Sequence, residues 1–264
     1  MRTKNLVTLL GLRLRYWVLT LGVSGAILIV RLGVRTPGIF AADVGAVGAY
    51  ITAIGTLYGI LAAFTIFVVW TQFNDAQTAA DTEANELRDL FRYTIYLRDS
   101  EALNALGRAI KDYSESVARD EWSAMGSGKA APETVGRFEA VFRAVHAVTF
   151  DDDRDALAWE KMIGKFEGVS DARSERLDLA MADVPTLLRG LLYLVSLSLI
   201  VGFFLLSISN DIIAISVTLA TTAVAFLVIE AVEDLDNPFG GYWALSPKSF
   251  LHLPEQIDAL GSGR

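Results

Sequence analysis

Four carboxylates stand close together late in the sequence, at the end of a long apolar stretch: Glu230, Glu233, Asp234 and Asp236. Carboxylate oxygens are the ligands that hard cations prefer, so this acidic run is a candidate cytoplasmic cation or gating site. An acidic, solvated exit from a helix has the same composition. Both interpretations stay open, and neither assigns a resident metal.

A second pattern lies in residues 44–74, where small side chains recur at alternating spacings of three and four, which places them on one face of a helix. Such a face either packs closely against another membrane helix or lines a pore that bulkier apolar residues narrow and gate by dewetting. The pore-lining candidates are Thr52, Gly55, Gly59, Ala62, Ile66, Val69 and Trp70.

Metal, cofactor and enzyme chemistry finds little support in the residue types. The sequence has no cysteine and only two histidines, which excludes thiolate zinc sites and cysteine nucleophiles. Residues 126–129, Gly-Ser-Gly-Lys, resemble the end of a phosphate-binding loop, but Ser123 and Ala130 stand where that motif needs Gly and Ser or Thr. We therefore expect no cofactor, no metal and no catalysis.

The composition and the distribution of charge predict the helices that carry the candidate residues. The chain has 264 residues, is 53% hydrophobic and only 20% charged, and is more apolar than an ordinary soluble domain. Four runs contain no Asp, Glu, Lys or Arg: 16–30, 44–74, 190–210 and 212–229. We interpret each run as a transmembrane helix. The second would reach roughly 46 Å as one helix, so part of it should leave the membrane still helical.

The basic residues set the expected orientation. Arg2, Lys4, Arg13 and Arg15 precede the first span, whereas the opposite side has only Arg31 and Arg35. By the positive-inside rule, both termini and residues 75–189 are expected in the cytoplasm of a multi-pass inner-membrane protein. A cleaved signal peptide is the alternative for the N-terminus. Residues 31–42 are too long and too basic for a usual cleavage region.

The segment between the second and third spans is expected to be helical, because its apolar residues recur at three and four. Breaks are predicted at 126–132, at 149–152 and near Gly164 and Gly168. The expected domains are residues 1–74 with the first two spans, a cytoplasmic helical domain at 75–189, the last two spans at 190–232, and a cytoplasmic tail at 233–264.

Net charge narrows the function further. The value of −8 argues against nucleic acid as a partner, because nucleic-acid binding depends on Lys and Arg that neutralise phosphates. No span has a charged residue in its middle, which counts against a proton relay or a charge-coupled transporter. The acidic cytoplasmic region slightly favours cations over anions in a channel, whereas Arg31 and Arg35 at the outer mouth would attract anions.

Several short motifs occur in order along the chain: Tyr58-Gly59, Ala63-Phe64, Trp70-Thr71-Gln72-Phe73, Glu83-Ala84, Glu121-Trp122, Leu235-Asp236-Asn237-Pro238-Phe239-Gly240-Gly241 and Ser246-Pro247. With the four-span layout, their order resembles the bestrophins, and more closely the bestrophin-like proteins of bacteria and plants, from about residue 44 to 250. The resemblance implies a pentameric ion channel whose second helix lines the pore, with a neck near Ala62, Ile66 and Trp70. Calcium-gated bestrophins have an acidic run after Asn-Pro-Phe-Gly, but Gly241 to Ala244 stand there in this chain.

The sequence therefore predicts an all-α, bestrophin-like protein with four transmembrane helices, a helical cytoplasmic insertion and assembly into a ring, most simply of five copies. Its expected partners are the lipid bilayer, other copies of itself and small inorganic ions, which would pass along an axis lined by the second span. The alternative is a membrane-anchored sensor or scaffold without a pore, in which the small-residue face serves only packing.

Overall fold

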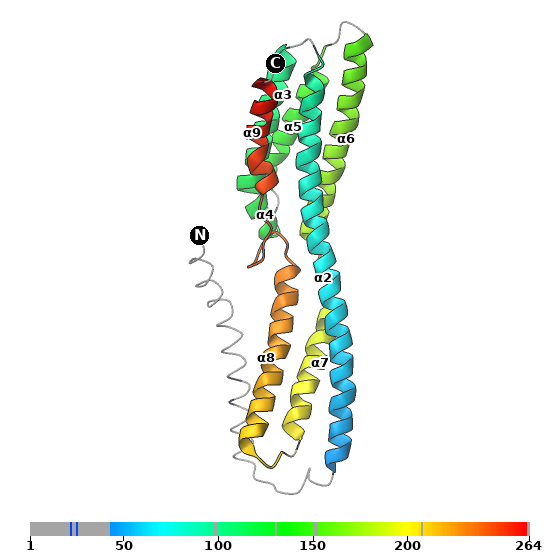
Figure 1. Ribbon diagram of the computed structural model, residues 1–264, viewed down its shortest axis with the longest axis vertical. Coiled ribbons are helices and arrows are strands. Elements are labelled where there is room, and N and C mark those ends of the chain that lie inside the picture. Colours follow the sequence, from blue (N-terminus) through cyan, green and yellow to red (C-terminus); the bar gives the residue numbers. More distant parts are fainter. Residues whose placement is uncertain are drawn as a thin grey trace. The chain divides into compact units, whose positions relative to one another are not determined.

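The computed structural model describes residues 22, 25, 43–97, 100–129, 131–149, 153–206 and 208–262. Every regular element in these ranges is a helix, and none of the described residues forms a strand (Figure 1). The chain divides into two compact units. The first unit is Met1–Trp70 with Asp183–Asp236, and the second unit is Thr71–Ala182 with Asn237–Arg264.

Helix α2 is the longest element and runs without a break from Val44 to Thr94, over 51 residues. This confirms that the second apolar run continues as helix beyond the length that a bilayer needs. Threonine hydroxyls within the apolar part donate to carbonyls one turn earlier, as from Thr52 Oγ1 to the Gly48 oxygen at 2.9 Å and from Thr65 Oγ1 to the Leu61 oxygen at 2.8 Å. These bonds satisfy the hydroxyls inside the helix itself.

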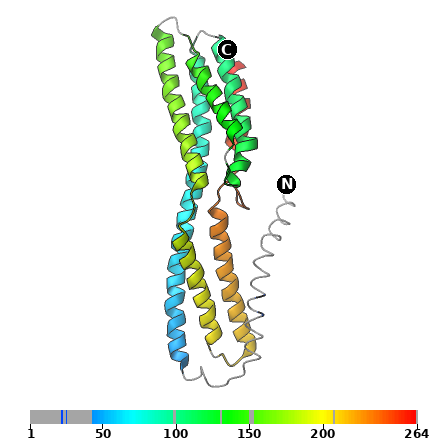
Figure 2. The ribbon, with the colours of Figure 1, turned by 180° about the vertical axis from the view of Figure 1, so that it is seen from behind.

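The first unit combines the first part of α2 with α7 (Thr186–Leu205) and α8 (Asp211–Leu235). α7 and α8 pack against each other, and α7 lies between α8 and α2 in both views (Figures 1 and 2). Among the described residues, α2, α7 and α8 supply the three helical stretches that are long and apolar enough to cross a membrane. Of the predicted first span, residues 16–30, the structure describes only residues 22 and 25, so this prediction lies almost entirely outside the described residues.

Helix α8 begins and ends where local chemistry requires. The side chain of Asn210 accepts hydrogen bonds from the backbone amides of Ile212 at 2.9 Å and Ile213 at 3.3 Å, which caps two amides that the helix cannot satisfy. The helix ends at Leu235, just before Asn237-Pro238, where proline was expected to stop it.

Small residues allow α2 and α7 to approach closely. A Cβ added to Gly202 of α7 would lie 2.9 Å from Cγ1 of Ile51, and one added to Gly55 of α2 would lie 3.7 Å from Cδ1 of Leu199. Tyr50 Oη also donates to the Ser198 carbonyl at 3.5 Å. Part of the small-residue face of α2 therefore packs against a helix of its own subunit.

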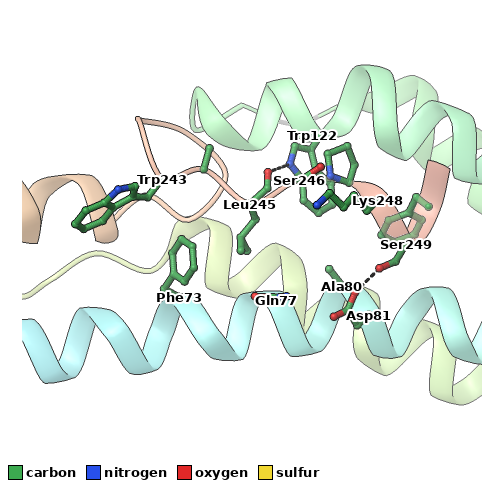
Figure 3. Close-up of a pocket in the computed structure, with 13 residues that line it drawn as sticks. Phe73, Gln77, Ala80, Asp81, Trp122, Trp243, Leu245, Ser246, Lys248 and Ser249 are labelled. Carbon is green, nitrogen blue, oxygen red and sulfur yellow. Dashed lines mark hydrogen bonds between the residues drawn. The ribbon is translucent and has the colours of Figure 1, made fainter. Parts of the chain in front are cut away.

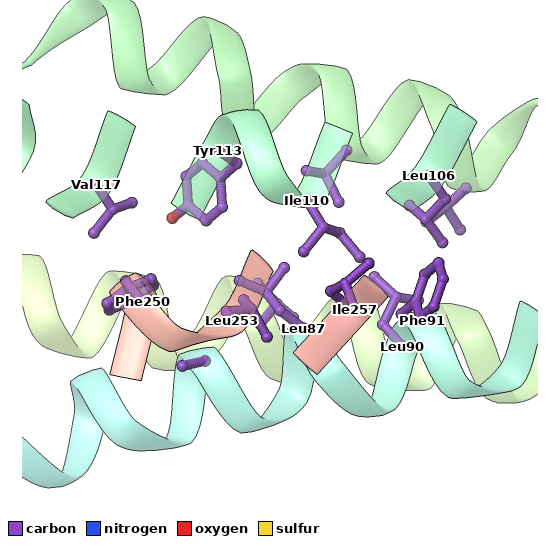
Figure 4. Close-up of a cluster of buried hydrophobic side chains, with 14 of the residues drawn as sticks. Leu87, Leu90, Phe91, Leu106, Ile110, Tyr113, Val117, Phe250, Leu253 and Ile257 are labelled. Atoms are coloured by element: carbon purple, nitrogen blue, oxygen red, sulfur yellow. The ribbon is translucent and has the colours of Figure 1, made fainter. Parts of the chain in front are cut away.

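The second unit packs several helices around the last part of α2: α3 (Ser100–Ser116), the π-helix η2 (Val117–Glu121), α4 (Trp122–Gly126), α5 (Pro132–His146), α6 (Asp153–Met181) and α9 (Lys248–Ser262). Figure 4 shows its core, in which Leu87, Leu90 and Phe91 of α2 meet residues of α3 and α9. The partners from α9 include Phe250, Leu253 and Ile257, each at most 2% exposed. The C-terminal segment is thus part of this core.

Two features of the second unit differ from the expected helix pattern. α6 continues through Gly164 and Gly168, where an interruption was expected. The physical reason at Gly168 is packing, because a Cβ there would lie 3.1 Å from Oε2 of Glu86, and glycine costs a helix only about 1 kcal/mol. Conversely, the π-helix at Val117–Glu121 had no sequence signal, since its extra residue changes the register without an apolar gap.

The segment after α8 packs backbone to backbone against the end of α4. A Cβ on Gly126 would lie 2.6 Å from the Phe239 carbonyl oxygen, and one on Gly240 would lie 2.8 Å from the Gly126 oxygen. The Asn237 amide donates to that same Gly126 oxygen at 3.1 Å. Only glycine leaves room for this approach, which explains the glycines at 126 and 240.

Candidate functional site

The part of α2 in the first unit has a buried face and an exposed apolar face. The buried face contains Tyr58, Ala62, Thr65 and Val69, which are at most 8% exposed. The exposed face carries large apolar side chains: Leu57, Ile60, Phe64, Phe67 and Trp70 are 49% to 67% exposed. Their spacing of three and four places them on one side of the helix, and the rest of the chain that the structure describes leaves them exposed.

The predicted pore-lining residues do not share one environment. Thr52, Gly59 and Trp70 are exposed, and Gly55 and Ile66 are half-buried. Ala62 is 6% exposed and Val69 is fully buried. Ala62 and Val69 are thus covered by other residues of their own chain, whereas the other predicted pore-lining residues are at least partly exposed. The small-residue face lies at the border between the packed and the exposed sides of α2.

The sequence interpretation missed Ile60, Phe64 and Phe67 because it followed the small residues. The signal was nonetheless present, since bulky apolar side chains recur at Leu57, Ile60, Phe64 and Phe67 with spacings of three, four and three. Small residues in a membrane helix indicate where backbones approach. The bulky residues on the other side are the ones left for neighbouring molecules, water or lipid.

The acidic run does not form a compact cluster. Asp236 accepts a hydrogen bond from the Val184 amide at 2.8 Å and pairs with the guanidinium of Arg189, and Glu233 accepts from Tyr193 Oη at 2.5 Å. Glu230 and Asp234 are half-buried. Within the described ranges, no group of three or more acidic or histidine side chains is arranged to hold a metal ion. The contacts at Asp236 and Glu233 instead join the start of α7 to the end of α8.

A buried ionic network lies at the centre of the second unit, and it was not predicted. Arg176 of α6 donates from Nε to Oε2 of Glu83 at 2.7 Å and from Nη2 to Oε2 of Glu121 at 2.8 Å. Arg173, one turn earlier, makes a two-point contact with Glu121 at 2.7 and 2.8 Å. Two arginines thus balance two glutamates from α2 and η2. Arg176 and Glu83 are completely buried.

Tyr113 of α3 joins this network. Its hydroxyl donates to Oε1 of Glu83 and accepts from Nη1 of Arg173 at 2.6 Å. Burial raises the pKa of Tyr113 well above 10.0, and the charge of Glu83 raises it further against the opposing arginines. The phenol therefore stays neutral at physiological pH and acts as a hydrogen-bond donor. Each of these five side chains is hydrogen-bonded to another member of the network. This favours a role in holding the helices together over a role in catalysis.

The π-helix positions Glu121 for this contact. Val117 and Glu121 are its buried residues, and the next residue, Trp122, packs its ring edge-on against Phe239 with centroids 5.0 Å apart. The Trp122 indole also donates to the Leu245 carbonyl at 2.8 Å. The added residue in this turn shifts the helix register, so Glu121 faces the arginines while Trp122 holds the segment after α8.

The charge of Glu121 should be visible in the pH dependence of stability. Burial alone would raise the pKa of this carboxyl, but hydrogen bonds and charges from Arg173 and Arg176 outweigh it and hold the pKa below 4.5. A lowered folded pKa adds stability above the unfolded value, and that stability is lost as pH falls through the folded pKa.

We therefore expect Glu121→Gln to lower the unfolding temperature at pH 7, and the difference from the unmodified protein to shrink below about pH 4. Thermal unfolding of the full chain in detergent between pH 3 and 8 measures both effects. The exposed Glu175 of α6 is the matched control, since its glutamine variant should follow the unmodified protein. A difference that stays constant over this range would contradict the assignment.

The motifs behind the family resemblance find structural roles mainly in the second unit. Glu83 and Glu121 belong to the ionic network, Trp122 contacts Phe239, and Asn237 holds the end of α4. Arg173, Arg176 and Tyr113 complete the same network, although no sequence motif distinguishes them from other residues of their helices. These residues of the motifs thus hold helices of the second unit together.

Comparison with known proteins agrees with this architecture. A bacterial bestrophin homologue from Klebsiella pneumoniae carrying a point mutation superposes with a TM-score of 0.69 at 16% identity, over 95% of this chain and 99% of that one. Another crystal structure of a bacterial bestrophin homologue from the same organism gives 0.69 at 14% identity, over 94% and 98%. A further membrane-protein structure gives 0.70 at 14% identity, over 94% and 98%.

These similarities establish the fold. The curated proteins contain no match to this sequence. The family model for the Bestrophin-like domain matches residues 17–250, which is most of the chain and includes both units. Together with the apolar helices of the first unit, this match identifies the chain as a membrane protein that belongs to the Bestrophin-like family.

Proposed function

We propose that this chain is one subunit of an oligomeric ion channel, in which α2 lines an axial pore for small inorganic ions. Membership of the Bestrophin-like family supports channel function in general terms. The observation that carries the specific proposal is the exposed apolar face of α2, with Ile60, Phe64 and Phe67 at 57% to 67% exposure. In a ring, this face is available for the axis because the opposite face packs within the subunit.

A neck of this composition can gate without charge. Ile60 and Phe64 are one helical turn apart, so copies of them around an axis would form stacked apolar rings. Water leaves a narrow apolar constriction readily, and ions cannot cross it when it is dry. Trp70 belongs to this face, and Thr52, Gly59 and Ile66 border it; together they complete the proposed lining.

The proposed arrangement places the ring, most simply a pentamer, in the cell inner membrane. Both termini and the second unit face the cytoplasm, because basic residues precede the first span and few follow it. Permeation would then proceed between the outer mouth, where Arg31 and Arg35 are expected, and an acidic inner side. This gradient of charge favours cations on the inner side.

The second candidate function is a membrane-anchored scaffold without a pore. The tight packing of Gly202 against Ile51 and Tyr50 of α2 favours it, because a larger side chain at this position would clash and the small residue therefore serves packing within the subunit. In a scaffold, the exposed face of α2 would be filled by neighbouring helices. The two functions therefore differ in whether an open path runs along the symmetry axis.

Recording from the purified full-length protein in a planar bilayer tests the proposal. A channel gives discrete current steps, and asymmetric salt on the two sides fixes the reversal potential and hence the sign of the permeant ion. A scaffold gives a stable oligomer in detergent but no current above that of empty bilayers. The oligomeric state should be measured on the same preparation, so that a failed assembly is not mistaken for a closed pore.

A further inference from the structure

A cavity of about 370 Å³ opens within the second unit, between α2 and the segment that leads from residue 243 to the start of α9 (Figure 3). Its volume is in the range of small-molecule sites. The wall from α2 contains Phe73, Gln77 and Asp81, which are spaced by four and therefore share one face of the helix.

The lining changes in polarity along the cavity. Phe73 and Trp243 lie together at one end, whereas Asp81 and Ser249 lie at the other (Figure 3). Ser246 and Lys248, which come from the segment that leads into α9, add a hydroxyl and an ammonium to the lining. The cavity therefore has two aromatic side chains at one end and the Asp81 carboxylate at the other. The Lys248 ammonium also belongs to its lining.

The charged groups are available to a ligand. Asp81 accepts one hydrogen bond, from Ser249 Oγ to Oδ1, which leaves its second oxygen for another donor. Lys248 is exposed and forms no ion pair with any residue that the structure describes. A ligand that carries both an ammonium and an anionic group would match these two side chains.

The place of the cavity on α2 indicates where such a ligand comes from. Phe73 lies only three residues after Trp70, about 5 Å along the helix, and Asp81 lies about 12 Å further on. The aromatic end is therefore the end nearer the apolar part of α2, and the charged end is the farther one. Aromatic side chains followed by charged ones are the order found at a membrane surface.

We propose that this cavity binds the headgroup of an amine-bearing phospholipid, such as phosphatidylethanolamine. The ammonium lies at the Asp81 carboxylate, the phosphate lies at Lys248 and the Ser246 hydroxyl, and the glycerol end lies against Phe73 and Trp243. The shared chemistry is that of a phosphoethanolamine group, and the polarity order of the lining selects the lipid as its source. This inference requires the membrane location of the chain but not its conductance.

Binding of defined lipids to the delipidated, assembled full-length protein tests this site, with native mass spectrometry as the readout. We expect saturable binding of one phosphatidylethanolamine per subunit. Asp81→Asn and Lys248→Gln should each weaken it by about tenfold, the effect of losing one charge-assisted contact. Asparagine can still accept from Ser249, so the fold should be retained, and thermal unfolding checks this.

The matched controls are Asp75→Asn on α2 and Lys161→Gln on α6, both at exposed positions outside the cavity, and they should bind the lipid as the unmodified protein does. Equal binding of diacylglycerol or phosphatidylglycerol would overturn the proposal, as would equal losses in the control variants. Soluble phosphoethanolamine binding as tightly as the lipid would overturn the lipid as its source. Because no outcome depends on ion flux, a failure here is distinguishable from a failure of the proposed channel.

Discussion

Exchange of Phe64 for alanine is expected to raise ion flux through the reconstituted protein by about tenfold, which corresponds to a barrier lower by ~1.4 kcal/mol. Phe64 is 57% exposed on the face of α2 opposite the subunit's own packing. If its ring forms the apolar neck, alanine widens the constriction and lets water remain in it. The measurement is ion flux from liposomes, with single-channel current as the second readout.

Two further variants make this result specific to the neck. Phe64→Leu keeps an apolar side chain of comparable reach and should change flux much less than alanine does. Leu197→Ala removes a similarly exposed apolar side chain from α7, which is 58% exposed, and should leave flux unchanged. Unchanged flux in Phe64→Ala with an intact ring would exclude Phe64 from the pore. Loss of the ring in this variant would show that Phe64 packs between subunits.

Exchange of Arg176 for methionine is expected to destabilise the protein by about 3–5 kcal/mol, because it leaves two buried carboxylates with only one guanidinium. Arg176 is fully buried and contacts both Glu83 and Glu121. Methionine roughly fills the volume of the arginine stem, so the cost is mainly electrostatic. In thermal unfolding of the full-length protein, this loss corresponds to a decrease of roughly 10 °C.

The double variant Arg176→Met with Glu83→Gln separates charge from packing. Glutamine removes the uncompensated carboxylate and can still accept the bond from Tyr113, so part of the lost stability should return. Arg92→Met is the control on α2, because the Arg92 side chain is 52% exposed and pairs with Asp89 at the surface, where ion pairs contribute about 0–1 kcal/mol. If Arg176→Met and Arg92→Met have equal effects, the buried network is not a major source of stability.

The apolar pattern of the sequence predicts much of the helical architecture, because the bilayer and the helix period constrain it strongly. The continuation of α2 past residue 74 follows from a charge-free run too long for a membrane, and the end of α8 follows from Asn237-Pro238. The structure confirms both. These features depend only on nearby residues, and local chemistry decides them.

The candidate site is harder to predict, because periodicity identifies a face but not what covers it. Ala62 and Phe64 lie two positions apart, yet one is 6% exposed and the other 57%. That difference depends on what packs beside α2, such as α7, whose residues contact Tyr50, Ile51 and Gly55. The small size of a residue does not by itself show what lies beside it; a Cβ at Gly55 would be 3.7 Å from Cδ1 of Leu199 in α7, an ordinary van der Waals contact.

The ionic network is invisible in sequence for a related reason. Arg173 and Arg176 look like ordinary basic residues of an amphipathic helix, and their carboxylate partners lie 52 to 93 positions away along the chain. The π-helix adds a further obstacle, since an apolar spacing of three and four does not reveal one inserted residue. Only the tertiary arrangement brings these charges together.

The unbroken length of α2 has a mechanical consequence. Phe64 and Glu83 belong to the same 51-residue helix, and about 28 Å of regular helix separates them. An α-helix without a proline or glycine hinge resists torsion, and the stretch between Phe64 and Glu83 contains neither residue. Phe64 and Glu83 therefore lie on one continuous helix, with no residue between them that favours a kink.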